Sequence, residues 1–258
     1  MSHDPMDRIR EQFTRQGAAY AKLEYVSHAK GLKAILAMAE ASQADRVLDV
    51  ACGPGFIAMA FAEVCAEVVG VDATDSFLQM AREESKRRNL QNLRFVEGDV
   101  TQMEFEDNAF DIAVCRAAFH HFPDPASVLH EMKRVVRPGG RLLVMDMLAS
   151  EDPDKAAYHQ RLEVLCDPTH AKALSPSAFE SLFTNCGITI TAQHDGQSKY
   201  AVEEWIAHGG PTETDAETLR ALLRACLDQD HAGIPVWEED DTLMMAHPGK
   251  SYVLRRSD

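Results

Sequence analysis

The chain has 258 residues, of which 45% are hydrophobic and 26% are charged, and its formal net charge is −15. This length and composition fit one large α/β domain with a well-filled core, and the acidic balance disfavours nucleic-acid binding, which needs clustered Lys and Arg. No stretch approaches membrane-spanning length, and the N-terminus lacks the apolar region of a secretory signal.

The six cysteines are scattered along the chain, and none forms a Cys-x-x-Cys pair. This pattern disfavours a zinc site or a disulfide framework and is typical of proteins kept in a reducing compartment. We therefore expect a cytoplasmic protein with no bound metal and with neither a nucleic acid nor a membrane as its partner.

Helical periodicity marks residues 5–20 and 28–41, and from residue 46 strands alternate with helices. The expected helices are 56–66, 74–88 and 125–137, the last with Asp124 as its cap and Pro138-Gly139-Gly140 as its stop. The expected strands are Arg46–Val50, Val68–Val71, Leu93–Val96, Phe110–Val114 and Arg141–Met145. This alternation predicts a doubly wound α/β fold with a mostly parallel sheet and helices on both faces.

The regular alternation weakens after residue 147. We expect partial helix at 151–172, a helix at 177–186, a strand at 188–192, helix over 201–229, irregular chain at 231–250 and a last strand at 251–255. No repeat or linker divides the sequence, so we predict a single domain. Its parts are N-terminal capping helices (1–42), a cofactor-binding core (43–150), and a lid with the last helices and strands (151–258).

A glycine loop follows the first predicted strand. Gly53-Pro54-Gly55 with Ala58 satisfies the G-x-G-x-x-A pattern of nucleotide cofactor sites, and Asp72 follows near the expected spacing of roughly 20 residues. The glycines allow the backbone to approach a ligand, and the carboxylate can accept hydrogen bonds from ribose hydroxyls. This signal alone admits both NAD and S-adenosylmethionine.

Two acidic residues favour S-adenosylmethionine. Asp49 lies within the first strand, where a carboxylate would repel a pyrophosphate but suits the ammonium and sulfonium groups of S-adenosylmethionine. Asp99 follows the third strand and could accept a hydrogen bond from an adenine amino group, with Val100 packed on the ring. Asp99 could instead serve only the turn after Gly98.

From about residue 10 to about residue 150 the chain resembles the class I S-adenosylmethionine-dependent methyltransferases, in the branch related to the ubiquinone and menaquinone C-methyltransferases. The motifs that carry the resemblance are VLDVACGPG, VVGVDAT, VEGDV, FDIAVCRAAFHHFPDP and RPGGRLLVMD, in that order. The resemblance implies a seven-stranded, mostly parallel sheet whose last strand is antiparallel. It also implies that S-adenosylmethionine is the cofactor.

The resemblance assigns site residues by position. Asp49, Gly53 and Gly55 would line the methionine end of the cofactor, and Ala51 would replace a glycine that is frequent in the family. The remaining cofactor contacts would be Asp72 and Ala73 at the ribose, Asp99 and Val100 at the adenine, Arg116 near the methionine, and Tyr20 on an N-terminal helix that also carries Phe13. Tyr20 could equally be a core residue.

His120 and His121 follow the fourth strand, next to the expected methyl group. Their near-neutral intrinsic pKa suits a general base, and we consider His121 first and His120 second. One could instead be a structural hydrogen-bonding group and the other solvated. The quinone C-methyltransferases have an Arg-Asn pair here, which argues against a quinone precursor as the acceptor.

The lid carries further polar residues that are typical of a solvated helix: His159, Arg161, Asp167, His170 and Lys172. We expect a methyltransferase that acts on the O, N or C nucleophile of a small molecule. The alternatives are an NAD-dependent oxidoreductase and a non-methylating member of the same fold.

Overall fold

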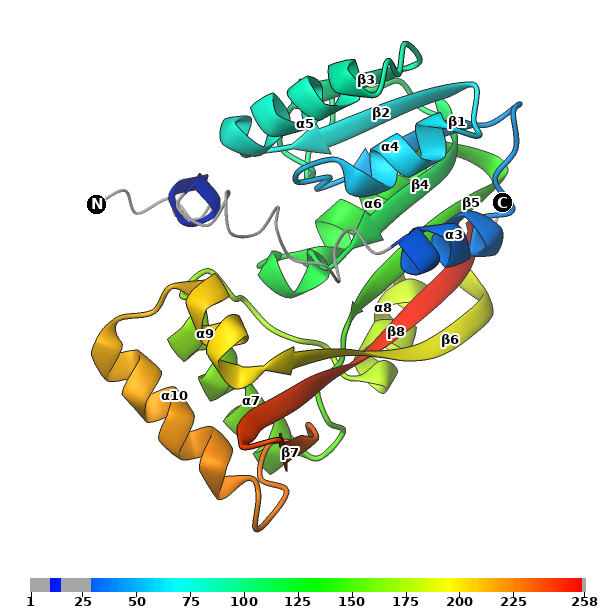
Figure 1. Cartoon of the computed structure of the whole chain (residues 1–258). Coiled ribbons are helices and arrows are strands. Elements are labelled where there is room, and N and C mark those ends of the chain that lie inside the picture. Colours follow the sequence, from blue (N-terminus) through cyan, green and yellow to red (C-terminus); the bar gives the residue numbers. More distant parts are fainter. Residues whose placement is uncertain (1–9, 15–28, 257–258) are drawn as a thin grey trace.

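The computed structural model of the chain describes residues 10–14 and 29–256 (Figure 1). Its helices are α3 (Ala29–Met38), α4 (Phe56–Ala62), α5 (Asp75–Arg87), α6 (Pro125–Val135), α7 (Pro153–Cys166), α8 (Pro176–Asn185), α9 (Val202–Gly209) and α10 (Glu213–Ala225), with a 3-10 turn, η1, at Phe119–His121. Its strands are β1 (Arg46–Val50), β2 (Glu67–Asp72), β3 (Leu93–Glu97), β4 (Phe110–Arg116), β5 (Val136–Met147), β6 (Ile188–Ala201), β7 (Val236–Glu239) and β8 (Thr242–Arg256). Residues 10–14 are also helical.

One mixed sheet contains all of these strands, in the order β3-β2-β1-β4-β5-β8-β6, with β7 paired to β8 beside this path. The first five strands are parallel, and β8 runs antiparallel to β5, β6 and β7. The predicted doubly wound, mostly parallel sheet with an antiparallel last strand is confirmed. The short strand β7 is an addition to the expected seven.

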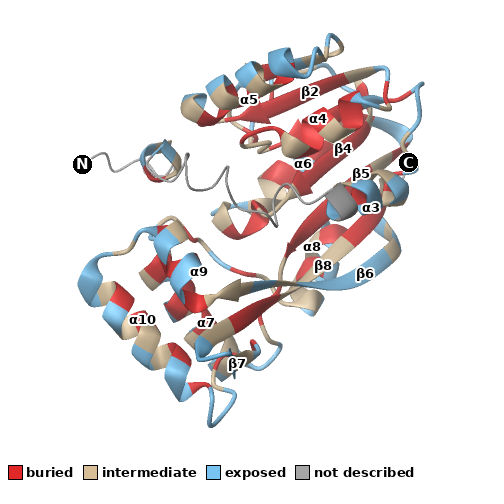
Figure 2. Ribbon diagram, viewed as in Figure 1, coloured by how far each residue is buried: buried red, intermediate tan, exposed pale blue. Residues whose placement is uncertain are grey.

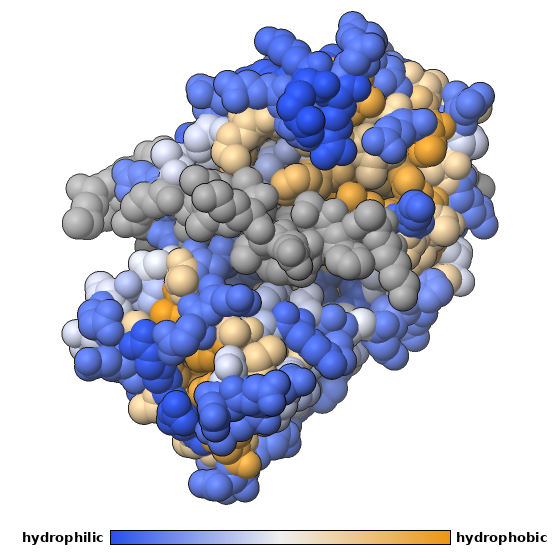
Figure 3. Space-filling view, viewed as in Figure 1, coloured by the Kyte–Doolittle hydropathy of each residue, from blue (hydrophilic) through white to orange (hydrophobic). Residues whose placement is uncertain are grey.

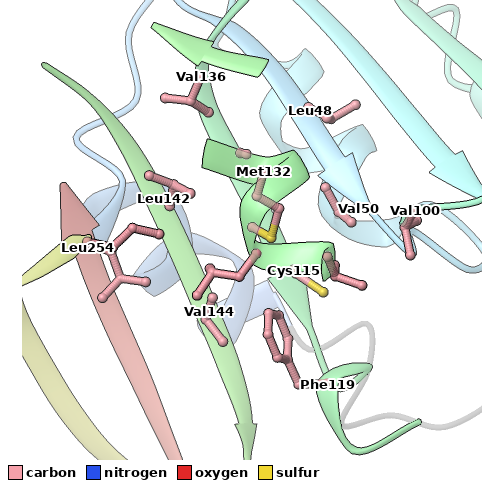
Figure 4. Packing of buried hydrophobic residues seen from close by; sticks show 14 of the residues in the cluster. Leu48, Val50, Val100, Cys115, Phe119, Met132, Val136, Leu142, Val144 and Leu254 are labelled. Carbon is pink, nitrogen blue, oxygen red and sulfur yellow. The ribbon is translucent and has the colours of Figure 1, made fainter. Parts of the chain in front are cut away.

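Helices cover both faces of the parallel part of the sheet. On one face, α3, α4 and α5 pack against the strands through residues such as Ile35, Phe61 and Leu78. On the other face, α6 and α8 bury a second cluster, part of which Figure 4 shows around Met132 and Phe119. Buried residues run along β2 and β4 in Figure 2, as expected for parallel strands covered on both sides.

A second lobe is built on the outer halves of β6 and β8, which extend beyond the parallel sheet (Figure 1). There α7, α9 and α10 pack into a separate hydrophobic cluster that includes Leu162, Trp205, Leu219 and Met245. Hydrophilic residues cover most of the outer surface of both lobes on the face shown in Figure 3. Among residues 10–14 and 29–256, no helix is both long and apolar enough to cross a membrane.

The expectation of irregular chain over 231–250 was wrong, because β7 and most of β8 lie there. Asp240 and Asp241 both have positive φ angles, 47° and 59°, and Glu239 pairs with Thr242 around them. These values match a two-residue hairpin turn of type I′, which usually contains glycine. Asp240 and Asp241 contain no such glycine, so the sequence did not predict the hairpin.

Three other boundaries differ from expectation. Strand β6 continues to Ala201 rather than ending at 192, because its second half pairs with β8. The helical segment 201–229 is two helices, divided at Gly210, whose φ is 66°. Helix α6 ends at Val135, and the Pro-Gly-Gly segment belongs to the beginning of β5.

Gly55 occupies a position that alanine should not tolerate. Its φ is +79°, and an added Cβ would lie 2.7 Å from ring atoms of Phe95 and 3.1 Å from Cβ of Ala81. Gly139 has a similar φ of +73° with nothing within 4 Å of an added Cβ, so it isolates the backbone effect. We expect Gly55→Ala to lower the free energy of unfolding by ~2–4 kcal/mol and Gly139→Ala by ~1–2 kcal/mol in urea titrations. Equal losses of unfolding free energy in the two variants would show that the contact with Phe95 does not contribute to the effect of Gly55→Ala.

Candidate functional site

The turn between β1 and α4 is held by a buried carboxylate. Helix α4 has Gly55 at its N-cap position and therefore no capping side chain of its own. Oδ2 of Asp49 accepts a hydrogen bond from the backbone N–H of Ala58 at 2.9 Å, which supplies that cap from the strand. Burial, together with the charge of Asp72, raises the pKa of Asp49 to about 8, although the bond from Ala58 opposes the shift.

Asp72 ties the end of β2 to the same turn. Its Oδ2 accepts from the backbone N–H of Gly53 and its Oδ1 from that of Thr74, both at 2.8 Å. Burial raises the pKa of Asp72, and these backbone hydrogen bonds limit the rise. Each carboxylate oxygen can accept further hydrogen bonds.

A first cavity opens at this edge of the sheet, with about 1140 Å³ of space that includes its open mouth. It lies outside the carboxyl ends of β1 and β2, where ligands bind in open α/β sheets. Most of the predicted cofactor residues line it: Asp49, Ala51, Gly53, Asp72, Ala73, Asp99, Val100 and Arg116. Gly55 does not line the cavity and serves the turn into α4, and Tyr20 lies outside the described residues.

Asp99 has a role in the local turn as well. Its Oδ1 accepts hydrogen bonds from the backbone N–H and from Oγ1 of Thr101, both at 2.8 Å. The turn and the cavity wall are therefore formed by the same side chain, so the two interpretations of Asp99 are compatible.

His120 forms a buried pair with Asp146, the residue that precedes the end of β5. Nδ1 of His120 lies 2.6 Å from Oδ1 of Asp146, and the His120 backbone N–H donates to Oδ2 at 3.2 Å. Burial would lower the pKa of His120, but the Asp146 carboxylate outweighs it and the net shift is upward. Asp146 was not predicted as a site residue, although it ends the motif RPGGRLLVMD.

His121 has the opposite electrostatic environment. Burial and the neighbouring His120 lower its pKa to about 4, so its ring is neutral near pH 7. Its Nδ1 lies 3.3 Å from the backbone oxygen of Thr169, and its ring meets that of Phe13 edge to face, with centroids 5.0 Å apart. A neutral imidazole with so low a pKa is a weak proton acceptor.

A second cavity adjoins the first, between the sheet and the second lobe. Four residues line both cavities: Phe13, Arg116, Ala117 and His121. The second cavity is also lined by Asp146 and by side chains outside every motif, which come together only in the folded chain: Glu163, Tyr200, Trp205, His208, His247 and Lys250.

The expectation that the polar lid residues are solvated holds for Arg161 and Lys172 but was wrong for His159 and His170, which are buried. His159 lies on the inner face of α7, with its Nε2 3.1 Å from Oε1 of Glu163. The helical pattern of α7 did not reveal this face, because its buried positions include charged and polar residues. Several buried ring nitrogens have no hydrogen-bond partner among the described residues: Nδ1 of His159, Nε2 of His170 and Nε2 of His247.

The helical turn at residues 10–14 bridges the two lobes beside these cavities (Figure 1). Nε of Arg10 donates to the backbone oxygen of Ala73 at 3.1 Å, and Nε2 of Gln12 donates to that of Gly209 at 2.9 Å. Phe13 of the same turn lines both cavities. In the part of the chain that the structure describes, this turn therefore contacts both lobes and lines both cavities.

Comparison with known proteins gives consistent results. Residues 41–205 match the model of a family described as a methyltransferase domain. An uncharacterized methyltransferase of Bacillus subtilis, YcgJ, is 28% identical over 233 residues, which cover 87% of this chain and 92% of that protein. A demethylmenaquinone methyltransferase of Geobacillus kaustophilus is 29% identical over 153 residues, or 57% of this chain and 65% of that protein. The crystal structure of a Bacillus halodurans protein assigned as a methyltransferase superimposes with a TM-score of 0.83 at 28% identity, covering 89% of this chain and 100% of that one.

The pairing of His120 with Asp146 can be tested by titration. In Asp146→Asn the carboxylate charge is lost while burial remains, so the pKa of His120 should fall below its ordinary value of about 6.5. Side-chain NMR of the histidine ring protons measures this shift directly. Asp124→Asn, at the exposed cap of α6, is the matched control and should leave His120 unchanged. An unaltered titration of His120 in Asp146→Asn would refute the pairing.

Proposed function

The chain belongs to the methyltransferase family that its residues 41–205 match, and on this premise we propose that it transfers the methyl group of S-adenosylmethionine to a small-molecule acceptor. The observation that carries the proposal is the pair of joined cavities. The first contains the predicted cofactor residues, and the second extends from it between the lobes. Bound donor and acceptor would therefore meet where Arg116, Ala117 and His121 line both.

The charges in the first cavity suit a cationic cofactor. Asp49 and Asp72 both line it and are both buried, and the charge of Asp72 disfavours ionisation of Asp49. A sulfonium and an ammonium group would relieve this repulsion, whereas a pyrophosphate would increase it. This contrast supports S-adenosylmethionine over the NAD alternative.

His120 with Asp146 is the better candidate for a general base than His121, the residue that the sequence analysis considered first. Asp146 pairs with Nδ1 of the His120 ring. Nε2 is therefore the nitrogen that would take a proton from the methyl acceptor in the second cavity. The pKa of His120 is raised by the Asp146 carboxylate, which makes it a stronger proton acceptor than His121, whose pKa is lowered to about 4. We assign His121 to the apolar wall at the junction of the cavities, against Phe13.

The form of the second cavity supports a small acceptor. Its walls come from α7, β6, β8 and the ends of β4 and β5, so the acceptor would lie between the lobes. Part of this wall lies in β8, beyond the region that matches the family model. The acceptor would therefore also contact residues outside the matched region, and demethylmenaquinone, named for one relative, is one member of the panel to test.

Binding of S-adenosylmethionine should release a proton. Near pH 7 the free Asp49 carboxyl, with its pKa of about 8, is mostly protonated, and a bound cation favours its ionised form. Affinity should therefore rise by up to ~10-fold between pH 6 and pH 7. Isothermal titration calorimetry in buffers of different ionisation enthalpy measures both quantities.

Asp49→Asn should bind more weakly and without proton release, whereas Asp75→Asn, on the exposed first turn of α5, should behave as the unaltered chain does. Absence of binding by the unaltered chain would refute the cofactor assignment. NADH fluorescence enhancement would then favour the oxidoreductase alternative, and binding without turnover across a broad acceptor panel would favour a non-methylating protein.

The general base can be tested once radiolabelled S-adenosylmethionine has identified an acceptor among phenols, quinols, amines and acidic carbon compounds. His120→Gln should lower kcat about 10²–10⁴-fold with nearly unchanged cofactor affinity, because only proton removal is lost. His121→Gln should lower kcat much less. A larger loss in His121→Gln than in His120→Gln would reverse the assignment.

A further inference from the structure

Three buried side chains of the second lobe converge on one point in the wall of the second cavity. His159 and Glu163 lie one turn apart on the inner face of α7, and His247 faces them from β8. A donor atom from each lies within 4.8 Å of the others. All three side chains are almost fully buried, with exposed fractions of 1%, 6% and 4%.

The distances suit ligands of one ion. Oε1 of Glu163 lies 3.1 Å from Nε2 of His159 and 2.8 Å from Nε2 of His247. Metal–ligand bonds of ~2.0–2.2 Å place neighbouring ligand atoms ~2.8–3.1 Å apart at right angles and ~3.3–3.6 Å apart in a tetrahedron. The two contacts therefore match an open site in which ligands occupy adjacent positions.

The orientation of His247 adds an independent observation. Its Nε2 is buried without a hydrogen-bond partner among the described residues, although the Glu163 oxygen is only 2.8 Å away. The short contact is therefore an ion-pair contact that does not count as a geometrically formed hydrogen bond at this ring nitrogen. His159 differs, because its Nε2 forms a hydrogen bond with the same Glu163 oxygen, and a bound ion would replace that bond.

The charge of Glu163 also needs a partner. Its ion-pair contacts within the described part of the chain are all histidines: His159, His170 and His247. A buried carboxylate is costly unless it is paired or coordinates a metal, and histidine nitrogens beside it are themselves common metal ligands. The rings of Tyr200 and Trp205 against His247 provide the apolar surroundings that metal sites frequently have.

We propose that His159, Glu163 and His247 bind a divalent first-row transition metal ion. Two imidazoles and one carboxylate with open positions are a ligand set used for Fe²⁺ and, with a water or substrate added, for Zn²⁺. None of these ligands belongs to the His120–Asp146 pair, although Glu163 and His247 line the same cavity, and metal binding can be measured without methyl transfer. The sequence offered no metal-ligand spacing here, because one ligand is 84 residues from the nearest other in the printed chain.

The test uses the full chain after treatment with a chelator, without cofactor or acceptor, so that its outcome is independent of the proposed function. Co²⁺, followed by its visible absorption, and Zn²⁺, followed by equilibrium dialysis and elemental analysis, should each bind at one ion per chain. Glu163→Gln and His247→Ala should weaken binding by more than the ~10–100-fold typical of losing an outer-shell partner. His194→Ala, which removes an exposed histidine of β6, should bind as the unaltered chain does.

Failure of the unaltered chain to retain either ion at micromolar concentration would overturn the proposal, as would unchanged binding in both ligand variants. Circular dichroism checks that the variants fold. If the variants do not fold, X-ray absorption at the zinc edge of the unaltered chain with bound Zn²⁺ identifies the ligand atoms. Two imidazoles with oxygen ligands would support the site, and thiolate sulfur would exclude it.

Discussion

Buried carboxylates at the carboxyl edge of the parallel sheet hold the site together. Asp49, Asp72 and Asp146 lie at or near the ends of three parallel strands, and each accepts backbone N–H groups from the segment beside it. These bonds fix the glycine turn, the start of α4 and the position of His120. Because the carboxylates are poorly solvated, the same groups that order the loops also favour a cationic ligand.

Strands β6 and β8, the longest strands of the described chain, extend through both lobes. The inner part of β8 pairs with β5 in the sheet, and its outer part pairs with β7 and carries residues of the second lobe. Trp205 and Leu162 then pack the helices of that lobe around it. The wall of the second cavity is therefore attached to the parallel sheet through continuous strands rather than a flexible linker.

Local sequence patterns were sufficient for the first half of the fold. The buried runs of β1 and β2, the glycine turn and the cap at Asp124 each depend on neighbouring residues, and their positions were predicted within one or two residues. The second half depends on long-range pairing. The Asp240–Asp241 turn has an unusual composition, and the convergence of Glu163 with His247 joins segments that no local period connects. Asp49 and Asp72 could be predicted because they lie close to the glycine turn in the sequence. Asp146 could not, because it meets His120 only through the pairing of distant segments.

The bridge made by residues 10–14 links the beginning of the chain to its last quarter, since the bond from Gln12 to Gly209 spans 197 residues. During synthesis, Gln12 leaves the ribosome long before its partner exists. The side of the bridge at Ala73, beside the first cavity, is available early, but the side toward the second lobe is not. The first cavity can thus assemble its floor while translation proceeds, and it acquires its complete cover only when almost the whole polypeptide has emerged.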